Sequence, residues 1–187
     1  QSLIIRKPDN VDEDIVGIAE LAQRILDLYY SIENRPKGRS PQISVSCATF
    51  VPKPFTPFQF EPQDTREEIE RKQKLLLDSV KSKKIKVSYH DADVSQLEAV
   101  LAKGDRRLCN VVYTAWKMGC KFDSWSEHFK FDVWLEAFEK CGVDPAYYAN
   151  RRAEYDEILP WDHLDYLVSK ERQSAPLQPF RRKQSHF

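Results

Sequence analysis

Residues 43–58 read ISVSCATFVPKPFTPF, and this stretch decides the fold class. Ile43, Val45 and Cys47 alternate with small polar residues, a pattern that predicts a β-strand with one buried face. Three prolines follow within the same stretch. Because proline lacks the backbone N–H that a helix interior or an inner strand needs, the chain beyond the strand should be extended and lined by aromatic side chains.

One amphipathic helix is predicted before this strand and a second one after it. Capping-box pairs, Asn10 with Glu13 and Thr65 with Glu68, mark where the helices start, and the second should run to about Val80. Apolar residues of the first helix recur at steps of three and four. Its inward face is therefore expected to comprise Ile15, Ile18, Ala22, Ile25, Tyr29 and Ile32.

The remainder of the chain changes in character. A short strand is predicted over residues 85–89, and helices should cover 94–103, 105–118 and 132–141, with another starting at Asp144-Pro145. Strand–helix alternation followed by helices alone predicts a mixed fold, α/β to α+β. The helical part is rich in aromatic residues, which we expect mainly in the core: Trp116, Phe122, Trp125, Phe129, Phe131, Trp134, Phe138, Tyr147, Tyr148, Tyr155 and Trp161.

Composition excludes several classes of protein. The 187 residues carry 29 basic and 29 acidic side chains, so no overall field draws in nucleic acid or an anionic membrane. The sequence has neither an apolar run of about 18 residues nor a secretory signal, and we expect a cytoplasmic protein. The one charge imbalance is at the end, where residues 173–187 should form a basic, mobile tail.

The four cysteines are too widely separated for a zinc site or a disulfide framework. Cys47, Cys109, Cys120 and Cys141 match no short-loop ligand spacing, so we expect free, buried thiols and no metal in this chain. With five glycines, the sequence also contains no glycine-rich phosphate cradle and no nucleophile elbow.

Two histidines stand beside carboxylates, in His90-Asp91 and Asp162-His163. A neighbouring carboxylate can orient an imidazole for proton transfer. The simpler interpretation is that either Asp91 or Asp93 caps the next helix, that Asp162 does the same after Pro160, and that each histidine satisfies backbone groups.

Two arginines, Arg106 and Arg107, are predicted in the first turn of a helix, where they oppose the helix dipole. Either they pair with carboxylates or they reach an anionic group. Because strand ends and helix starts hold functional groups in α/β proteins, we expect His90, Asp91, Arg106 and Arg107 to face the substrate.

Residues 50–59 resemble the late barrel segment of radical S-adenosylmethionine (radical SAM) enzymes, in which a strand carries a Pro-x-Pro-x-Thr-Pro element. Over about residues 8–172 the chain is similar to an uncharacterised bacterial radical SAM family of iron–sulfur oxidoreductases with an N-terminal cobalamin-binding-like domain. One departure is Ile5-Arg6-Lys7-Pro8, where the family usually has Gly-Leu-Pro, so no cofactor contact is carried over there. The blocks that carry the resemblance are residues 50–59, 90–91, 97–108, 115–116, 122–125 and 159–163.

The resemblance implies that residues 1–60 are the last strand–helix units of a partial (β/α) barrel, followed by a helix-rich domain over residues 61–172. The intact parent would bind a [4Fe-4S] cluster, S-adenosylmethionine and, through its N-terminal domain, cobalamin. Phe50 and Val51 correspond to the wall against the adenine of the cofactor, in the intact protein only.

The Cys-x3-Cys-x2-Cys motif of such clusters is missing from this sequence, so the chain should be inactive without the remainder of its own polypeptide, to which a substrate of unknown identity would also bind. Because the chain alone would expose apolar surface that the barrel would cover, we expect it either to associate with itself or to hold residues 1–60 loosely. The alternative function is a non-catalytic module that binds a protein or an RNA.

Overall fold

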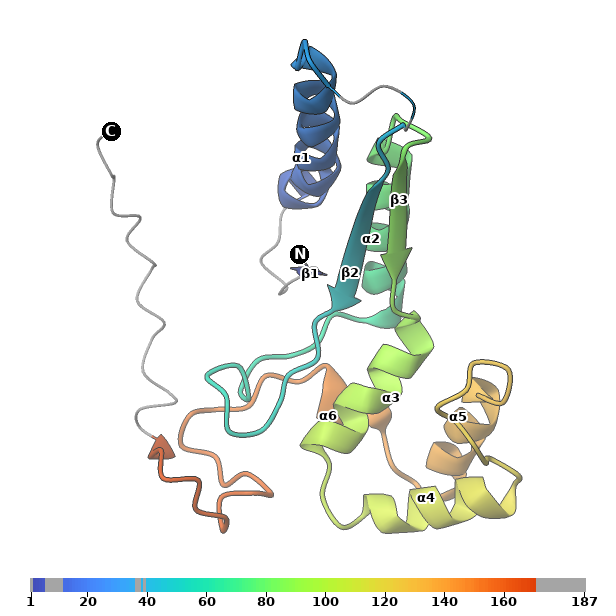
Figure 1. Cartoon of the computed structure of the whole chain (residues 1–187). Coiled ribbons are helices and arrows are strands. Elements are labelled where there is room, and N and C mark those ends of the chain that lie inside the picture. Colours follow the sequence, from blue (N-terminus) through green and yellow to red (C-terminus); the bar gives the residue numbers. More distant parts are fainter. Residues whose placement is uncertain (1, 6–11, 36–37, 39, 171–187) are drawn as a thin grey trace.

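The computed structural model describes residues 2–5, 12–35, 38 and 40–170. Within these ranges the fold is mixed α/β and mostly helical, which confirms the predicted class (Figure 1). Residue Asn10, the Arg6-Lys7-Pro8 stretch and the predicted tail at 173–187 lie outside the described residues. The elements are β1 (Ser2–Ile5), α1 (Asp12–Ser31), β2 (Ile43–Thr49), α2 (Arg66–Ser79), β3 (Ile85–Tyr89), α3 (Ala92–Lys103), α4 (Leu108–Lys117), α5 (Phe131–Lys140) and α6 (Pro145–Ala149).

The three strands form one parallel sheet in the order β1-β2-β3. Ile43 pairs with Ile85 and Cys47 with Tyr89, so both predicted strands are confirmed and lie side by side (Figure 1). Alternation along β2 places Val45 and Cys47 in a core shared with α1 and α2. The opposite face carries the exposed serines Ser44, Ser46 and Ser88.

The inward face of α1 differs from the predicted one. The structure buries Ile15, Ala19, Ala22 and Leu26, whereas Ile25 and Ile32, which we expected inside, are each 50% exposed. Both sets of residues obey helical spacing, so periodicity alone cannot choose between them. Ile15 and Ala22 are buried as predicted, and Ala19 joins them in the core that α1 shares with the sheet.

The remaining helices form a second core below the sheet in Figure 1. Helix α3 packs on α6, and α4 packs on α5. All four helices were predicted, with boundaries that differ by up to three residues. The largest difference is at α4, which begins at Leu108 because residues 105–107 form a turn in which Asp105 accepts the Arg107 backbone N–H at 2.9 Å. Asp144 caps α6, as its position before Pro145 predicted.

The prediction that the aromatic residues lie mainly in the core is wrong for nearly half of them. Helix α4 packs through Val111 and Ala115, which leaves Trp116 on the outside. Trp134, Phe138, Tyr148 and Trp161 are buried as expected. The exposed ones are Trp116, Phe122, Trp125, Tyr147 and Tyr155.

The boundary between the sheet part and the helical part lies later than the predicted residue 60. Leu76 of α2 and Ile85 of β3 share a core with Ile15 and Val45, so residues 66–89 belong with the sheet. The helical part therefore begins near Ala92, at the start of α3. None of the described helices is long and apolar enough to cross a membrane.

Candidate functional site at the ends of the parallel strands

A cavity of about 370 Å³ lies where β2 and β3 end. Because the strands are parallel, their carboxyl ends meet at one edge of the sheet, which is where open α/β sheets bind ligands. The volume falls in the range of small-molecule sites, roughly 300–1,000 Å³. The lining residues are Ala48, Thr49, Phe50, Val51, Lys53, Thr56, Phe58, His90 and Glu98.

The cavity wall is apolar and its backbone is fixed. The Phe50 ring meets Phe58 edge to face, with centroids 5.7 Å apart and planes at 80°. Thr56 holds the turn between them, since its hydroxyl donates to the Lys53 carbonyl at 2.8 Å and accepts from the Phe58 N–H at 3.3 Å. Val51 is half-buried beside these groups. The wall can therefore contact a planar, apolar ligand group without rearranging.

A charged pair and an imidazole supply the polar part of the lining. Lys53 Nζ lies 2.5 Å from Glu98 Oε1, and both side chains are about half exposed. His90 reaches the cavity from the end of β3. Its backbone carbonyl accepts from Gln73 Nε2 at 2.9 Å, whereas its imidazole has no hydrogen-bond partner among the residues that the structure describes. That imidazole is free to donate to or accept from a ligand.

The simpler interpretation of Asp91 is confirmed. Its carboxylate caps α3, accepting from the backbone N–H groups of Asp93 at 2.8 Å and Val94 at 3.3 Å. Asp91 therefore does not orient the imidazole of His90. It fixes the start of α3, which in turn places Glu98 at the cavity.

The two arginines lie away from this cavity. They follow the carboxyl end of α3, whereas His90 precedes its amino end, and a helix of this length spans about 18 Å. Arg107 pairs with Asp105, with Nη2 and Oδ2 2.6 Å apart, and this hydrogen bond lowers the pKa of the Asp105 carboxyl. Arg106 is exposed. The structure thus brings His90 together with Phe50 and Val51, but not with Arg106 and Arg107.

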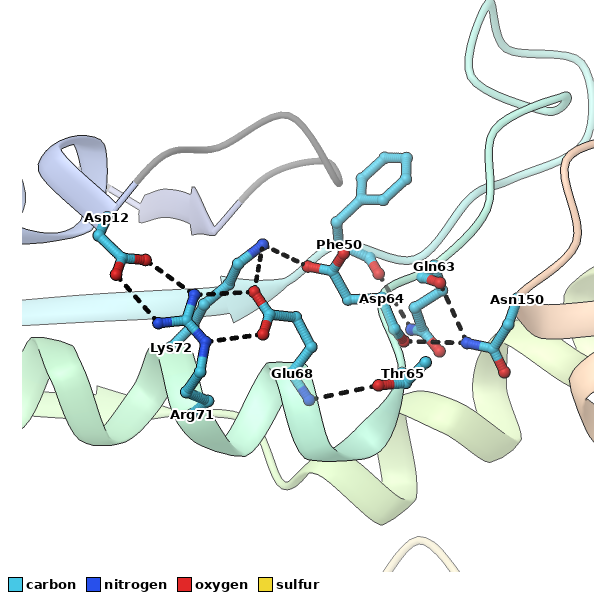
Figure 2. Close-up of polar contacts among 9 residues, drawn as sticks. All are labelled: Asp12, Phe50, Gln63, Asp64, Thr65, Glu68, Arg71, Lys72 and Asn150. Carbon is cyan, nitrogen blue, oxygen red and sulfur yellow. Dashed lines mark hydrogen bonds and ion pairs between the residues drawn. The ribbon is translucent and has the colours of Figure 1, made fainter.

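A polar cluster, which we name the polar joint, fastens the cavity wall to the helices (Figure 2). Gln63 Nε2 donates to the carbonyls of Phe50 and Ser95, each at 3.0 Å. Asn150 Nδ2 donates to the carbonyls of Gln63 and Asp64, also at 3.0 Å. The joint thus links the end of β2 to α3 and to the residue after α6, because the Gln63 side chain that binds the Phe50 carbonyl also binds Ser95, and the Gln63 backbone binds Asn150.

Charged residues extend the polar joint along α2. Lys72 is 1% exposed and its ammonium lies 2.7 Å from Asp64 and 3.5 Å from Glu68. Arg71 donates to Glu68 and to Asp12 of α1, which lowers the pKa of both carboxyls (Figure 2). The ion pairs thereby connect α1, α2 and the loop that forms the cavity.

Lys103 is a second buried ammonium, 7% exposed, which donates to the carbonyls of Glu61 at 3.2 Å and Arg151 at 3.0 Å. Burial, and then the charge of Arg151, lower its pKa from 10.5 to about 8. Between these two pH values the unfolded chain holds a proton that the folded chain has lost. The contribution of Lys103 to the free energy of unfolding should therefore rise with pH.

We predict that wild-type protein gains roughly 2 kcal/mol over Lys103→Met between about pH 8 and pH 10, since one pKa unit is worth about 1.4 kcal/mol. Urea unfolding at a series of pH values measures both proteins. Burial raises the pKa of the Cys47 and Cys120 thiols, which makes the free energy of unfolding fall as pH rises. Both proteins share this effect, so it cancels when their free energies of unfolding are subtracted at each pH. A difference that stays constant with pH would contradict the prediction.

Asp162, in the second histidine segment Asp162-His163, does not cap a helix. Residues 155–168 consist of turns and bends, so the predicted capping role of Asp162 is wrong. Its carboxylate instead accepts from the Leu159 N–H at 2.9 Å and pairs with Lys170. Trp161 is buried and donates its indole N–H to Gln59 at 2.7 Å. Residues 155–168 therefore pack against the proline-rich loop that follows β2.

The cysteines are free, as predicted, but they are not all buried. Cys47 and Cys120 are buried, Cys141 is half-buried, and Cys109 is exposed on α4. Among the described residues no group of three or more His, Cys, Asp or Glu side chains is arranged to hold a metal ion.

The residues that sequence reasoning missed are mostly buried amides: Gln59, Gln63 and Gln73. Each bonds to a group distant in the sequence, as Gln59 does to Trp161, so no local spacing could have indicated them. Comparisons of this chain with protein-family models, with curated proteins and with solved structures find no match.

Proposed function

We propose that this chain supplies the last strand–helix units of the partial barrel in a radical SAM iron–sulfur oxidoreductase, together with the helical part that follows. In this proposal the cavity at the ends of β2 and β3 forms part of the site for S-adenosylmethionine and substrate. The observation that carries it is the meeting of Phe50, Val51 and His90 in one cavity. We also propose that the protein is located in the cytoplasm.

The way in which the sheet is covered supports this assignment. Parallel sheets normally have helices on both faces, because both faces are apolar. Here α1 and α2 share one core with the sheet, while the opposite face exposes Ser44, Ser46 and Ser88. A polar inner face is what a partial barrel with a wet lumen requires.

The lining of the cavity fits the adenine end of the cofactor. Phe50 and Val51 offer an apolar wall, and Phe58 holds the Phe50 ring from its edge. S-adenosylmethionine would supply the 5′-deoxyadenosyl radical when bound with the cluster. The described residues contain no set of three thiolates for that cluster, so its ligands, like those of any cobalamin, would come from the rest of the polypeptide.

His90 is the residue that we expect to act on substrate. His90 lines the cavity, and its imidazole, which bonds to no other residue that the structure describes, can hold or transfer a proton at a ligand atom. Lys53 and Glu98 at the same cavity can exchange their mutual contact for polar groups of the ligand. Arg106 and Arg107 remain candidates only for a substrate long enough to extend past α3.

We predict that His90→Ala in the full-length protein lowers substrate turnover about 100-fold, the lower range for loss of a general acid or base. Cofactor cleavage without substrate and the melting temperature should hold, since the imidazole bonds to none of the described residues. Lys121→Ala is the matched control, because it removes an exposed charge that does not line the cavity. Equal losses in the two variants would contradict the role of His90.

A second candidate function rests on the exposed aromatic residues. Tyr113 and Trp116 stack on α4 with centroids 5.8 Å apart, beside a groove of about 490 Å³ that Leu101 and Val112 also line. Such a surface is better suited to binding a protein than to binding RNA, because the chain has no net charge. An upstream reading frame without a Cys-x3-Cys-x2-Cys motif would favour this function over the enzyme.

A further inference from the structure

The groove beside α4, which we name the α4 groove, is a hollow of about 490 Å³ where α3 ends and α4 begins, toward the bottom of Figure 1. Gly104 shapes its floor, because a side chain at this position would collide with Leu108 and come within 2.9 Å of the Val100 carbonyl oxygen. The hollow therefore depends on the sequence of this corner. Its lining residues are Leu101, Gly104, Asp105, Leu108, Cys109, Val112, Tyr113 and Trp116.

One wall of the α4 groove is an apolar stripe that faces solvent. Val112, Tyr113 and Trp116 are 43%, 54% and 53% exposed, whereas the opposite side of α4 is buried against its neighbours. Together with Cys109 they follow steps of three, one and three residues, which place them on one face of the helix. The stacked rings of Tyr113 and Trp116 stiffen this wall. An amphipathic helix binds in a groove through anchors of this kind.

The unpaired charges next to the α4 groove are basic. From residue 106 to residue 122 the sequence has four basic side chains and no acidic one. Arginines at the start of a helix oppose its dipole, and Arg107 is compensated by its ion pair with Asp105. In the part of the chain that the structure describes, no carboxylate pairs with the exposed side chains of Arg106 and Lys117. Lys117 Nζ lies over the Tyr113 ring, 4.6 Å from its centroid.

Arg106 and Lys117 stand at the two ends of the apolar wall. Arg106 comes just before α4 and Lys117 is its last residue, so about 16 Å of helix rise separates them. A partner helix of three or four turns lying along α4 would reach both cations. The apolar wall and its basic ends together match a helix with one apolar face and acidic flanks.

We propose that the α4 groove docks an acidic amphipathic helix of a protein partner. The apolar face of that helix would lie against Val112, Tyr113 and Trp116, and its carboxylates would pair with Arg106 and Lys117. The inference rests on the second candidate function, whose partner it names. It is also compatible with the enzyme, because the α4 groove and the cavity at the strand ends share no lining residue.

Two other occupants match the charges less well. A second copy of the chain would bring Arg106 and Lys117 against the same residues of the first copy, and like charges that face each other across an interface are unfavourable. RNA is attracted to basic side chains, but surfaces that bind it carry Lys and Arg clustered on one face. Here the centre of the surface is apolar and only its ends are basic.

Labelling of the native Cys109 thiol tests the proposal on the present chain, since Cys109 is exposed and lines the groove. The probe is a synthetic helical peptide with leucines along one face and glutamates on the other. Its twin carries lysines in place of the glutamates. We expect the glutamate peptide to slow labelling of Cys109 at least about fivefold and the lysine peptide less than about twofold. Cys141, outside the groove, is the internal reference.

Three variants locate the contact, with fluorescence anisotropy of the labelled glutamate peptide as the measurement. Trp116→Ala should weaken binding at least about tenfold, because an aromatic anchor is lost. Arg106→Ala should weaken it about threefold, and added salt should reduce this difference, since salt screens exposed charges. Lys74→Ala, which removes an exposed charge from α2, is the control and should change nothing. If Trp116→Ala lowers the melting temperature, Val112→Ser takes its place.

Equal protection of Cys109 by the two peptides, or protection by neither, overturns the proposal. Protection by single-stranded oligouridine that equals that of the glutamate peptide also overturns it, because the occupant is then RNA. Protection that grows with protein concentration in the absence of peptide does the same, because it indicates a second copy. The measurement needs neither cluster nor cofactor, so its failure leaves the proposed enzyme function standing, and the reverse also holds.

Discussion

Replacing Asp64 with alanine is expected to lower the free energy of unfolding by about 3 kcal/mol. The substitution leaves the Lys72 ammonium, which is 1% exposed, without its partner at 2.7 Å. Glu68 remains, but at 3.5 Å and on the exposed side of the helix. An ammonium that has lost both water and its close carboxylate is costly to keep buried, so the native state should lose most of the stability of the polar joint.

Urea unfolding followed by circular dichroism measures this effect. The control is Glu136→Ala, which breaks the Lys140–Glu136 pair on α5, where both side chains are 54% exposed, and should cost about 0.5 kcal/mol or less. Asp64→Asn keeps an acceptor for Lys72 and should fall between the two. A loss for Asp64→Ala no larger than that of the control would show that Lys72 reaches water in solution.

The chain alone should yield no 5′-deoxyadenosine from S-adenosylmethionine after anaerobic reconstitution with iron and sulfide. Its cysteines are the reason. The two nearest in the sequence are Cys109 and Cys120, and the described structure gathers no three thiolates at one place. A cluster that activates the cofactor needs three thiolates around one cubane.

The full-length protein is the matched comparison and should become brown and cleave the cofactor under the same conditions. Absorption spectroscopy and chromatography of the nucleoside products measure both proteins. A brown, active preparation of the present chain would refute the prediction, because its own residues would then hold the cluster. A full-length protein that stays colourless would refute the proposed function.

Much of the local structure could be predicted from the sequence because its causes are local. Alternation over residues 43–47 and 85–89 specifies two strands, and the observed strands start at the predicted residues. Thr65 caps α2 through the Glu68 N–H and Asp144 caps α6, as their side chains and positions predicted. The mixed α/β class follows from the order of these elements.

Only tertiary structure decided which residues meet. The sequence placed Phe50, Val51 and His90 at strand ends, but pairing of β2 with β3 in one parallel register brought them to a single cavity. The same placement left Arg106 and Arg107 beyond the far end of α3. The sequence could not reveal this separation, because it depends on α3, a helix about 18 Å long that lies between His90 and the two arginines.

Burial was the property that the sequence determined least. Helical spacing allowed Ile25 as well as Ala19 and Leu26 to face inward from α1, and packing against the rest of the protein buried only Ala19 and Leu26. Aromatic residues of equal hydrophobicity lie inside at Trp134 and outside at Trp116, because only the first faces a neighbouring helix. Capping and alternation thus follow from a few adjacent residues, whereas burial and the polar joint depend on partners that only the folded chain supplies.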